Sequence, residues 1–193
     1  MLLTVTLSAC STYSPTNTTK STDSASATQP IDRQTSYKAI TTEEINLAQE
    51  AWGNGIINIG KAYSNGGDYR QAAIDLINNL YAYNYEDGVV LFKPTKASIK
   101  VFRSTKESAL SYFVGNNKKH TEDGGFALEP WVSVVFDNHQ IYRHGDIAIA
   151  MGEYTFTDPK GGSATAQYTF GYTQTTSGQL KIFLHHSSLP YDG

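Results

Sequence analysis

The C-terminal third of the chain decides the fold, because four β-like segments follow one another there at hairpin spacing. They read WVSVVFDNHQIY (131–142), GDIAIAMGEYTFTD (145–158), SATAQYTFGYTQT (163–175) and QLKIFLHHSSLP (179–190). Valine, isoleucine, threonine and aromatic residues suit pleated strands. The turns between the segments, RHGD, DPKGGS and TSGQ, carry the Gly, Pro and Asp that hairpins require. The four segments therefore predict an antiparallel meander.

Helical segments and short strands precede the meander. ITTEEINLAQEAWGNGIINIGKAY (40–63) repeats apolar residues at helical spacing, with Glu44 at capping-box distance from Thr41. YRQAAIDLINNLYAY (69–83) predicts a second helix, and three shorter segments follow: strands GVVLFKP (88–94) and ASIKVFR (97–103), and the helix STKESALSYFVG (104–115). One curved, mainly antiparallel sheet with the N-terminal helices packed on it buries both patterns, which predicts an α+β fold. This order of elements is also that of the cone-shaped nuclear transport factor 2-like fold, which carries a pocket between sheet and helices.

The first 37 residues differ in composition from the rest. MLLTVTLSAC (1–10) is a short apolar run that ends in Cys10 and resembles the lipobox of bacterial lipoproteins, which implies cleavage before Cys10 and a lipid on its thiol. Residues 11–37 are dominated by Ser, Thr and Ala and predict a flexible linker. We therefore expect a signal peptide over 1–10, a linker over 11–37 and a single domain over 38–193. The protein would be exported and either periplasmic or a membrane-anchored bacterial lipoprotein.

Charge and cysteine content exclude several classes of protein. The net charge of -3 and the pI of about 5.9 leave no basic stripe for phosphates, so no nucleic-acid partner is expected. A single cysteine permits no intrachain disulfide and no CxxC site. No segment approaches the ~20 apolar residues that span a bilayer.

Five histidines, at positions 120, 139, 144, 185 and 186, are the candidate metal ligands. Zinc requires two or three imidazoles aimed at one atom about 2 Å away. Adjacent strand residues point to opposite faces, so His185 and His186 cannot share a pocket without a bulge. The same geometry separates a serine from the neighbouring histidine, and no GxSxG elbow is present. We expect neither a multi-histidine metal site nor a covalent serine hydrolase.

Glu153 is the one carboxylate of the meander that is not near a turn. It shares a strand face with Ile147, Ile149 and Met151. If that face is the concave one, Glu153 is a buried acid or base with a raised pKa. The alternative is a glutamate at the sheet edge paired with a nearby cation.

The polar ending of the last strand predicts one wall of a pocket. Strand alternation places His186 and Ser188 on the same face as Leu180, Ile182 and Leu184, and turns His185 and Ser187 to the other face unless a bulge reverses this parity. Hydroxyl groups bind small polar molecules without charge and can relay protons. Further hydroxyls that could join this wall are Tyr168 and Tyr172 or Thr169 and Thr173, depending on register, together with Thr95 and Tyr112.

The segments YTFGYTQTTSGQLKIFLHHSSLPY (168–191) and IAIAMGEYTFTD (147–158) resemble the domain of bacterial relatives of the calcium/calmodulin-dependent kinase II association domain. Within that group, the ending HHSSLP is similar to that of the iota class of carbonic anhydrases. LFKPT (91–95) and SALSYFVG (108–115), which contain Thr95 and Tyr112, are similar to segments of the same class. The resemblance runs from about residue 41 to residue 191.

The resemblance implies reversible hydration of carbon dioxide to bicarbonate. Some members of the iota class depend on manganese, and in others a Thr, a Tyr and a Ser of the terminal motif hold the substrate without metal. We expect no cofactor, with manganese or zinc as the alternative. The expected catalytic residues are Thr95, Tyr112, His186 and Ser188. The expected substrate contacts are Thr95, Tyr112, Tyr168, His185, Ser187 and Ser188, and the sequence leaves open whether Ser187 or Ser188 fills the serine role.

Two other functions compete with the carbonic anhydrase. Kinase association domains of this fold build rings, so a non-enzymatic binding or oligomerising module is one alternative. A small-molecule isomerase or cyclase in the same fold is the other, and it would need Glu153 as its base. By fold analogy we expect a homodimer paired through the convex side of the sheet, with Tyr154, Phe156 and Phe183 at the interface.

Overall fold

A five-stranded sheet and three α-helices make up the part of the chain that the computed structural model describes, residues 38–191. The predicted signal peptide, the linker and Cys10 lie outside the described residues. No described helix is long and apolar enough to span a membrane.

The sheet has the order β1-β5-β4-β3-β2. Strands β2 (Ser133–His144), β3 (Ile147–Thr157), β4 (Ser163–Gln174) and β5 (Leu180–Ser188) form the antiparallel meander, which confirms the prediction. The short strand β1 (Leu91–Lys93) pairs in parallel with the end of β5. Because of this pairing, the chain that follows β1 begins beside the HHSS segment.

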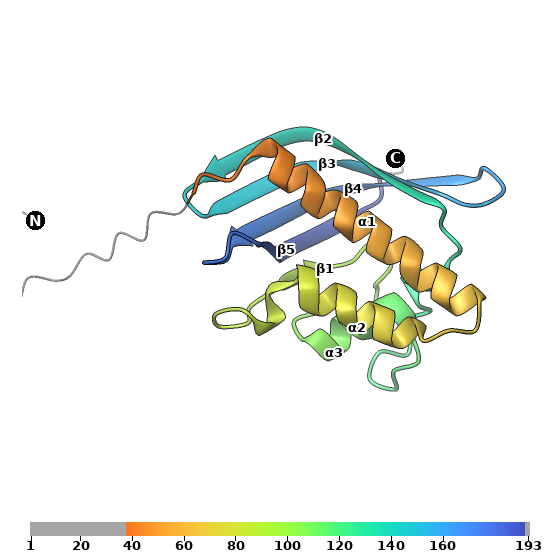
Figure 1. Cartoon of the computed structure of the whole chain (residues 1–193). Coiled ribbons are helices and arrows are strands. Elements are labelled where there is room, and N and C mark those ends of the chain that lie inside the picture. The colour runs from red at the N-terminus through yellow and green to blue at the C-terminus, as the bar shows by residue number, and fades with distance from the viewer. Residues whose placement is uncertain (1–37, 192–193) are drawn as a thin grey trace, which may run out of the picture. The chain divides into compact units, whose positions relative to one another are not determined.

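The helices cover one face of this sheet, here called the inner face. Helix α1 (Thr42–Ser64) runs across it, while α2 (Tyr69–Leu80) and α3 (Lys106–Val114) lie beyond β1 (Figure 1). Two 3-10 turns, Ala82–Asn84 and Phe126–Leu128, connect these elements. The face of the sheet away from the helices is called the outer face.

The start of α1 follows the predicted capping box. The Thr41 hydroxyl accepts a hydrogen bond from the Glu44 N–H at 3.1 Å, and the Glu44 carboxylate accepts one from the Thr41 N–H at 2.8 Å. These bonds satisfy N–H groups that the first turn would otherwise leave unpaired.

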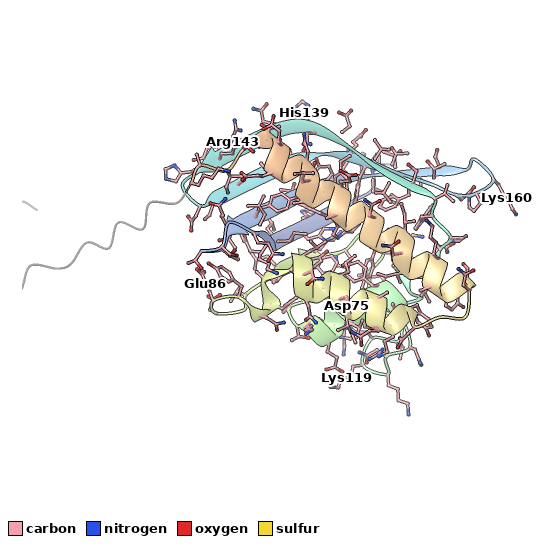
Figure 2. All side chains as sticks on the ribbon, in the orientation of Figure 1. Asp75, Glu86, Lys119, His139, Arg143 and Lys160 are labelled. Atoms are coloured by element: carbon pink, nitrogen blue, oxygen red, sulfur yellow. The ribbon has the colours of Figure 1, made fainter. Side chains whose placement is uncertain are left out.

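Trp52 of α1 is the centre of the core. It is 1% exposed, and its ring lies 5.6–6.2 Å from rings of four sheet strands. The rings that it contacts are Phe136, Tyr154, Phe156, Phe170 and His185. Charged side chains such as Asp75, Lys119 and Lys160 are exposed at the periphery (Figure 2). The core is therefore largely aromatic, and polar groups within it need partners.

The segment 97–103, predicted as a strand, is a loop. The Glu122 carboxylate accepts hydrogen bonds from the N–H groups of Ser98, Ile99 and Lys100 at 2.7–2.9 Å, so these groups do not enter a β-ladder. The same bonds lower the pKa of Glu122 to about 2. Alternating apolar residues suggested a strand. The backbone N–H groups that would pair in a sheet instead donate to the Glu122 carboxylate, 22 to 24 residues further along the chain.

A bulge in β5 reverses the predicted face of the HHSS segment. Gly171 pairs with Leu184 and Tyr172 pairs with Ile182, so Phe183 is an extra residue in β5. A Cβ at Gly171 would approach the Phe183 ring to 2.8 Å, so the bulge requires glycine there. After Phe183 the alternation is shifted by one residue. The prediction that His186 and Ser188 share the face of the buried Leu180 and Ile182 was wrong.

Candidate active site

His185 and Ser187 face the core, each 2% exposed. His186 is exposed, and Ser188 is half-buried on the outer face. Since a strand presents alternate residues to one face, the single bulge turns His185 and Ser187 inward and His186 and Ser188 outward.

Ser187 is the centre of a cluster of three hydroxyl groups. Its Oγ forms hydrogen bonds with the Thr95 hydroxyl and with the Tyr154 hydroxyl. Thr95 comes from the chain just after β1, Tyr154 from β3 and Ser187 from β5. Each hydroxyl can donate one hydrogen bond and accept two, so the cluster keeps unused bonding capacity.

Tyr154 was not predicted in the site. The sequence predicts Tyr154 and Phe156 at an interface on the convex side of the sheet, and this prediction is wrong, because both residues are 3% exposed and lie on the inner face. Burial raises the pKa of Tyr154 to about 12, while hydrogen bonds from Ser187 and Thr95 partly oppose this shift. Tyr154 is therefore a neutral phenol near neutral pH.

A cavity of about 70 Å³ adjoins the cluster. Its lining includes Thr95, Tyr154, Phe126, Trp131 and Phe156. A water molecule needs about 10–15 Å³ of such space, so the cavity holds a molecule of a few atoms. The wall is apolar apart from a few hydroxyls, as is usual for sites that bind small molecules. The exposed residues Lys96, Thr165 and Leu189 also border the cavity, which marks its open side.

Tyr112 of α3 stands next to this cavity. Its ring stacks on Phe126 at 5.6 Å, and Phe126 is part of the cavity wall. Burial raises the pKa of Tyr112 well above its ordinary value, and a hydrogen bond with the backbone of Lys96 partly offsets this. The structure thus brings together Thr95, Tyr112 and Ser187 from three separate segments.

A buried ion pair holds the segment between β1 and α3 against the loop that follows α3. Arg103 Nη2 lies 2.5 Å from Asp123 Oδ1, and both side chains are fully buried. The Ser111 hydroxyl donates to the other Asp123 oxygen at 2.6 Å, and Ser111 is the neighbour of Tyr112. The Arg103 guanidinium carbon also lies 6.0 Å from the centre of the Tyr112 ring. These contacts fix Tyr112 relative to the segment that carries Thr95.

His185 is enclosed by aromatic rings. Phe92 stacks on it at 4.4 Å, and Phe170 meets it at 4.2 Å. Nδ1 of His185 lies 2.8 Å from the Tyr81 hydroxyl, whereas Nε2 is buried without a hydrogen-bond partner. Burial, with a smaller contribution from His186, lowers the pKa of His185 well below its ordinary value. His185 is therefore neutral.

Tyr168 and Glu153 do not join the hydroxyl cluster. The Tyr168 hydroxyl donates to Asn138 at 2.7 Å and accepts from Gln49 at 3.2 Å. Glu153 is exposed on the outer face. It lines a separate hollow of about 620 Å³ together with His186 and Ser188. Of the two placements left open for Glu153, the structure shows the exposed one, so Glu153 is not the pocket base that an isomerase or cyclase would need.

The arrangement of side chains in residues 38–191 offers no candidate metal site. No three His, Cys, Asp or Glu side chains in this part of the chain are placed to hold an ion.

The fold and site define a class of protein: an α+β domain with a small, mainly apolar pocket beside a cluster of neutral hydroxyl groups on the inner face of the sheet. The family model described as metal-independent carbonic anhydrase matches residues 43–189. The chain belongs to this family. A metal-independent carbonic anhydrase of Nostoc sp. (strain PCC 7120) is 39% identical over 180 residues, covering 92% of this chain and 87% of that protein.

Solved structures agree with this assignment. The iota-carbonic anhydrase from a cyanobacterium, complexed with bicarbonate, is 40% identical, with a TM-score of 0.77 over 80% of this chain and 95% of that chain. A protein from Xanthomonas campestris assigned as a calcium/calmodulin-dependent protein kinase II association domain has the same fold, at 19% identity and a TM-score of 0.53. It covers 82% of this chain and 97% of its own. The predicted fold and family are confirmed.

Proposed function

We propose that this protein catalyses the reversible hydration of carbon dioxide to bicarbonate and a proton, without a metal, at the Thr95–Ser187–Tyr154 cluster. The observation that carries the proposal is a cluster of three hydrogen-bonded hydroxyls, two of which, on Thr95 and Tyr154, line a cavity of about 70 Å³, in a chain of the metal-independent carbonic anhydrase family. The solved relative bound to bicarbonate supports the same substrate.

The cluster suits the oxygens that change during hydration. When water attacks the carbon of carbon dioxide, one C=O bond opens and negative charge develops on its oxygen. The two hydrogen bonds within the cluster use two of its three hydroxyl hydrogens, so one O–H remains to donate to that oxygen. Tyr112, whose ring stacks on Phe126 of the cavity wall, is our candidate to orient the attacking water. Donors fixed in advance in a dry, aromatic site stabilise such charge more than mobile water does.

The proton released by the attacking water needs a path out of the site. The residues that line the cavity include no carboxylate and no imidazole. A hydroxyl chain can accept one proton while passing on another, so Tyr154, Ser187 and Thr95 form the first part of the route. Lys96 at the open side adds a positive charge where bicarbonate leaves and enters.

The test is a stopped-flow assay of carbon dioxide hydration by the purified full-length protein, with elemental analysis of the same sample. We expect hydration above the buffer rate after treatment with a chelator, with no stoichiometric metal. Activity that disappears on chelation and returns with manganese or zinc would contradict the metal-free site. Absence of any activity would favour a non-enzymatic module.

A homodimer through the outer face is part of the proposal. No helix among the described residues covers this face, and Val135, Ile147 and Met151 are 60%, 39% and 47% exposed on it. Apolar groups of this size on one face favour association. Light scattering should give twice the monomer mass, and Met151→Lys should lower it. A monomer at micromolar concentration would reject this pairing.

Export and lipid anchoring are proposed from the N-terminal sequence. Cys10 ends a lipobox-like run, and 27 residues separate it from the start of the described domain at Lys38. Expressed in a bacterium, the full chain should partition into membranes and incorporate labelled fatty acid, whereas Cys10→Ala should do neither. Equal partitioning of the two proteins would exclude the anchor.

A further inference from the structure

The unpartnered Nε2 of His185 is the starting point. It is a buried polar atom, on a side chain 2% exposed, in a core where polar groups are normally paired. The opposite ring nitrogen, Nδ1, meets the Tyr81 hydroxyl at 2.8 Å. The position of the ring proton decides whether Nε2 is a donor or an acceptor.

Trp52 settles the direction of the hydrogen bond between Tyr81 and His185. The indole N–H of Trp52 can only donate, and it lies 3.0 Å from the Tyr81 oxygen. Tyr81 is 1% exposed and has one hydrogen of its own, so that hydrogen points to His185 Nδ1. The reverse arrangement, with a proton on Nδ1, would strand the Tyr81 hydrogen and leave a bare lone pair on Nε2. It would therefore bury two unsatisfied groups, which costs more than burying one.

We infer that the chain Trp52–Tyr81–His185 holds His185 as the neutral Nε2–H tautomer, so that its imidazole is a fixed N–H donor beside the hydroxyl cluster and not the proton acceptor. Trp52 and Tyr81 are thus positioning residues. The catalytic meaning of this donor rests on the proposed function, while the tautomer itself does not.

The aromatic contacts place His185 one ring away from the hydroxyl cluster. Trp52 contacts both His185 and Tyr154, at 5.6 and 5.7 Å. Phe92 contacts both His185 and Tyr112, at 4.4 and 5.7 Å. One shared ring therefore separates the imidazole from each of the two tyrosines.

The residues around His185 provide little that would stabilise its protonated, positively charged form. Helix α1 supplies Trp52, β1 supplies Phe92 and β4 supplies Phe170, none of which ionises. The titratable neighbours are Tyr81, which burial keeps protonated, and the outward-facing His186. No carboxylate has a resolved hydrogen bond or ion pair with His185 among the described residues. A proton acceptor would need a free lone pair, and the one on Nδ1 is occupied by Tyr81.

The test reads the tautomer directly. Long-range proton–nitrogen NMR spectra of full-length protein labelled with ¹⁵N-histidine distinguish the two ring nitrogens, and His185→Gln assigns the signals. We expect His185 to stay neutral, with its proton on Nε2, from about pH 6 to about pH 8. A proton on Nδ1, or titration of His185 within this range, would overturn the inference whatever the activity of the protein.

Tyr81→Phe isolates the hydrogen bond, and Tyr83→Phe is its matched control. Tyr83 stacks on Tyr81, but its hydroxyl donates to the Arg103 carbonyl. Tyr81→Phe should shift the His185 Nδ1 signal towards that of an unbonded nitrogen and lower kcat about fivefold, with the pH profile unchanged in shape. Tyr83→Phe should leave the Nδ1 signal in place. An Nδ1 signal that is unmoved by Tyr81→Phe would refute the hydrogen-bonded chain Trp52–Tyr81–His185. An inactive wild type with the expected tautomer would refute only the proposed function.

Discussion

The inner and outer faces of β5 carry the same residue types with opposite properties. His185 and Ser187 are buried among aromatic rings and hydroxyls, whereas His186 and Ser188 border an open hollow on the outer face. The inner imidazole is held neutral by burial, and the inner serine has two hydroxyl partners. Because each face carries one histidine and one serine, the difference in burial and bonding comes from the face on which the side chain lies and not from the type of residue. Pairs of substitutions on the two faces test this difference.

Ser187→Ala and Ser188→Ala give the largest expected contrast. Ser187→Ala removes the centre of the hydroxyl cluster and should lower kcat/KM for hydration about 100-fold or more, the usual effect of losing one preorganised donor. Ser188→Ala should retain nearly full activity, because the Ser188 side chain lies on the outer face. Stopped-flow measurements on both proteins make the comparison, and the opposite ranking would place the site on the outer face.

Tyr154→Phe and Tyr168→Phe compare two buried tyrosines of neighbouring strands. Tyr154→Phe removes a hydroxyl bonded to Ser187 but keeps the ring, so we expect kcat about 10- to 100-fold lower with an unchanged fold. Tyr168→Phe removes bonds to Asn138 and Gln49 and should affect thermal stability more than kcat. Circular dichroism checks the fold of both variants. Equal losses of kcat in the two variants would contradict a specific role of the Tyr154 hydroxyl in catalysis.

His185→Gln and His186→Gln differ in their effect on stability against pH. The folded-state pKa of His185 lies below the unfolded value of about 6.5, so only the unfolded chain gains this proton as the pH falls below about 6.5. The wild type should therefore lose up to about 1.4 kcal/mol per pH unit below that value. Urea unfolding between about pH 5 and pH 8 measures the slope. His185→Gln should flatten it, and His186→Gln should not; an unchanged slope in His185→Gln would contradict a buried neutral imidazole.

Lys96→Ala should give the smallest effect on activity. Lys96 is exposed at the open side of the cavity, so its charge acts through a screened field. We expect kcat/KM for bicarbonate dehydration to fall by a few-fold at low salt and to approach the wild-type value at high salt. Lys160→Ala, at the β3–β4 turn, is the control. A loss that does not depend on salt would assign Lys96 a direct contact instead.

Sequence patterns predicted the helices and the meander strands, but they failed for the segment 97–103 and for the face of β5 that carries the site. The period of two in the meander and the capping box at Thr41 correspond to structure. The prediction of which face each residue of the HHSS segment occupies failed, because strand alternation assumes a strand without bulges. In β5 the extra residue Phe183 forms a bulge. A signal was present in Gly171, since a glycine inside a strand often marks a bulge. The bulge in β2 beside His139 likewise faces a glycine, Gly152.

Tyr154 was missed for a different reason. Both faces of β3 are apolar: Ile147, Ile149 and Met151 lie on one, and two alanines with Tyr154 lie on the other. The larger side chains suggested the core, yet it is the face with the alanines that is buried. Thr95 and Tyr112 were found through family resemblance, because their meeting with Ser187 depends on the ion pair and loop contacts between distant segments.

The position of bicarbonate bound to this protein tests the central claim most directly. A crystal structure of the protein soaked in bicarbonate should show the anion in the cavity beside Thr95 and Tyr154, within hydrogen-bond distance of the Ser187 hydroxyl. Bicarbonate in the outer hollow, bonded to Ser188 and His186 with the inner cavity filled only by water, would contradict the account.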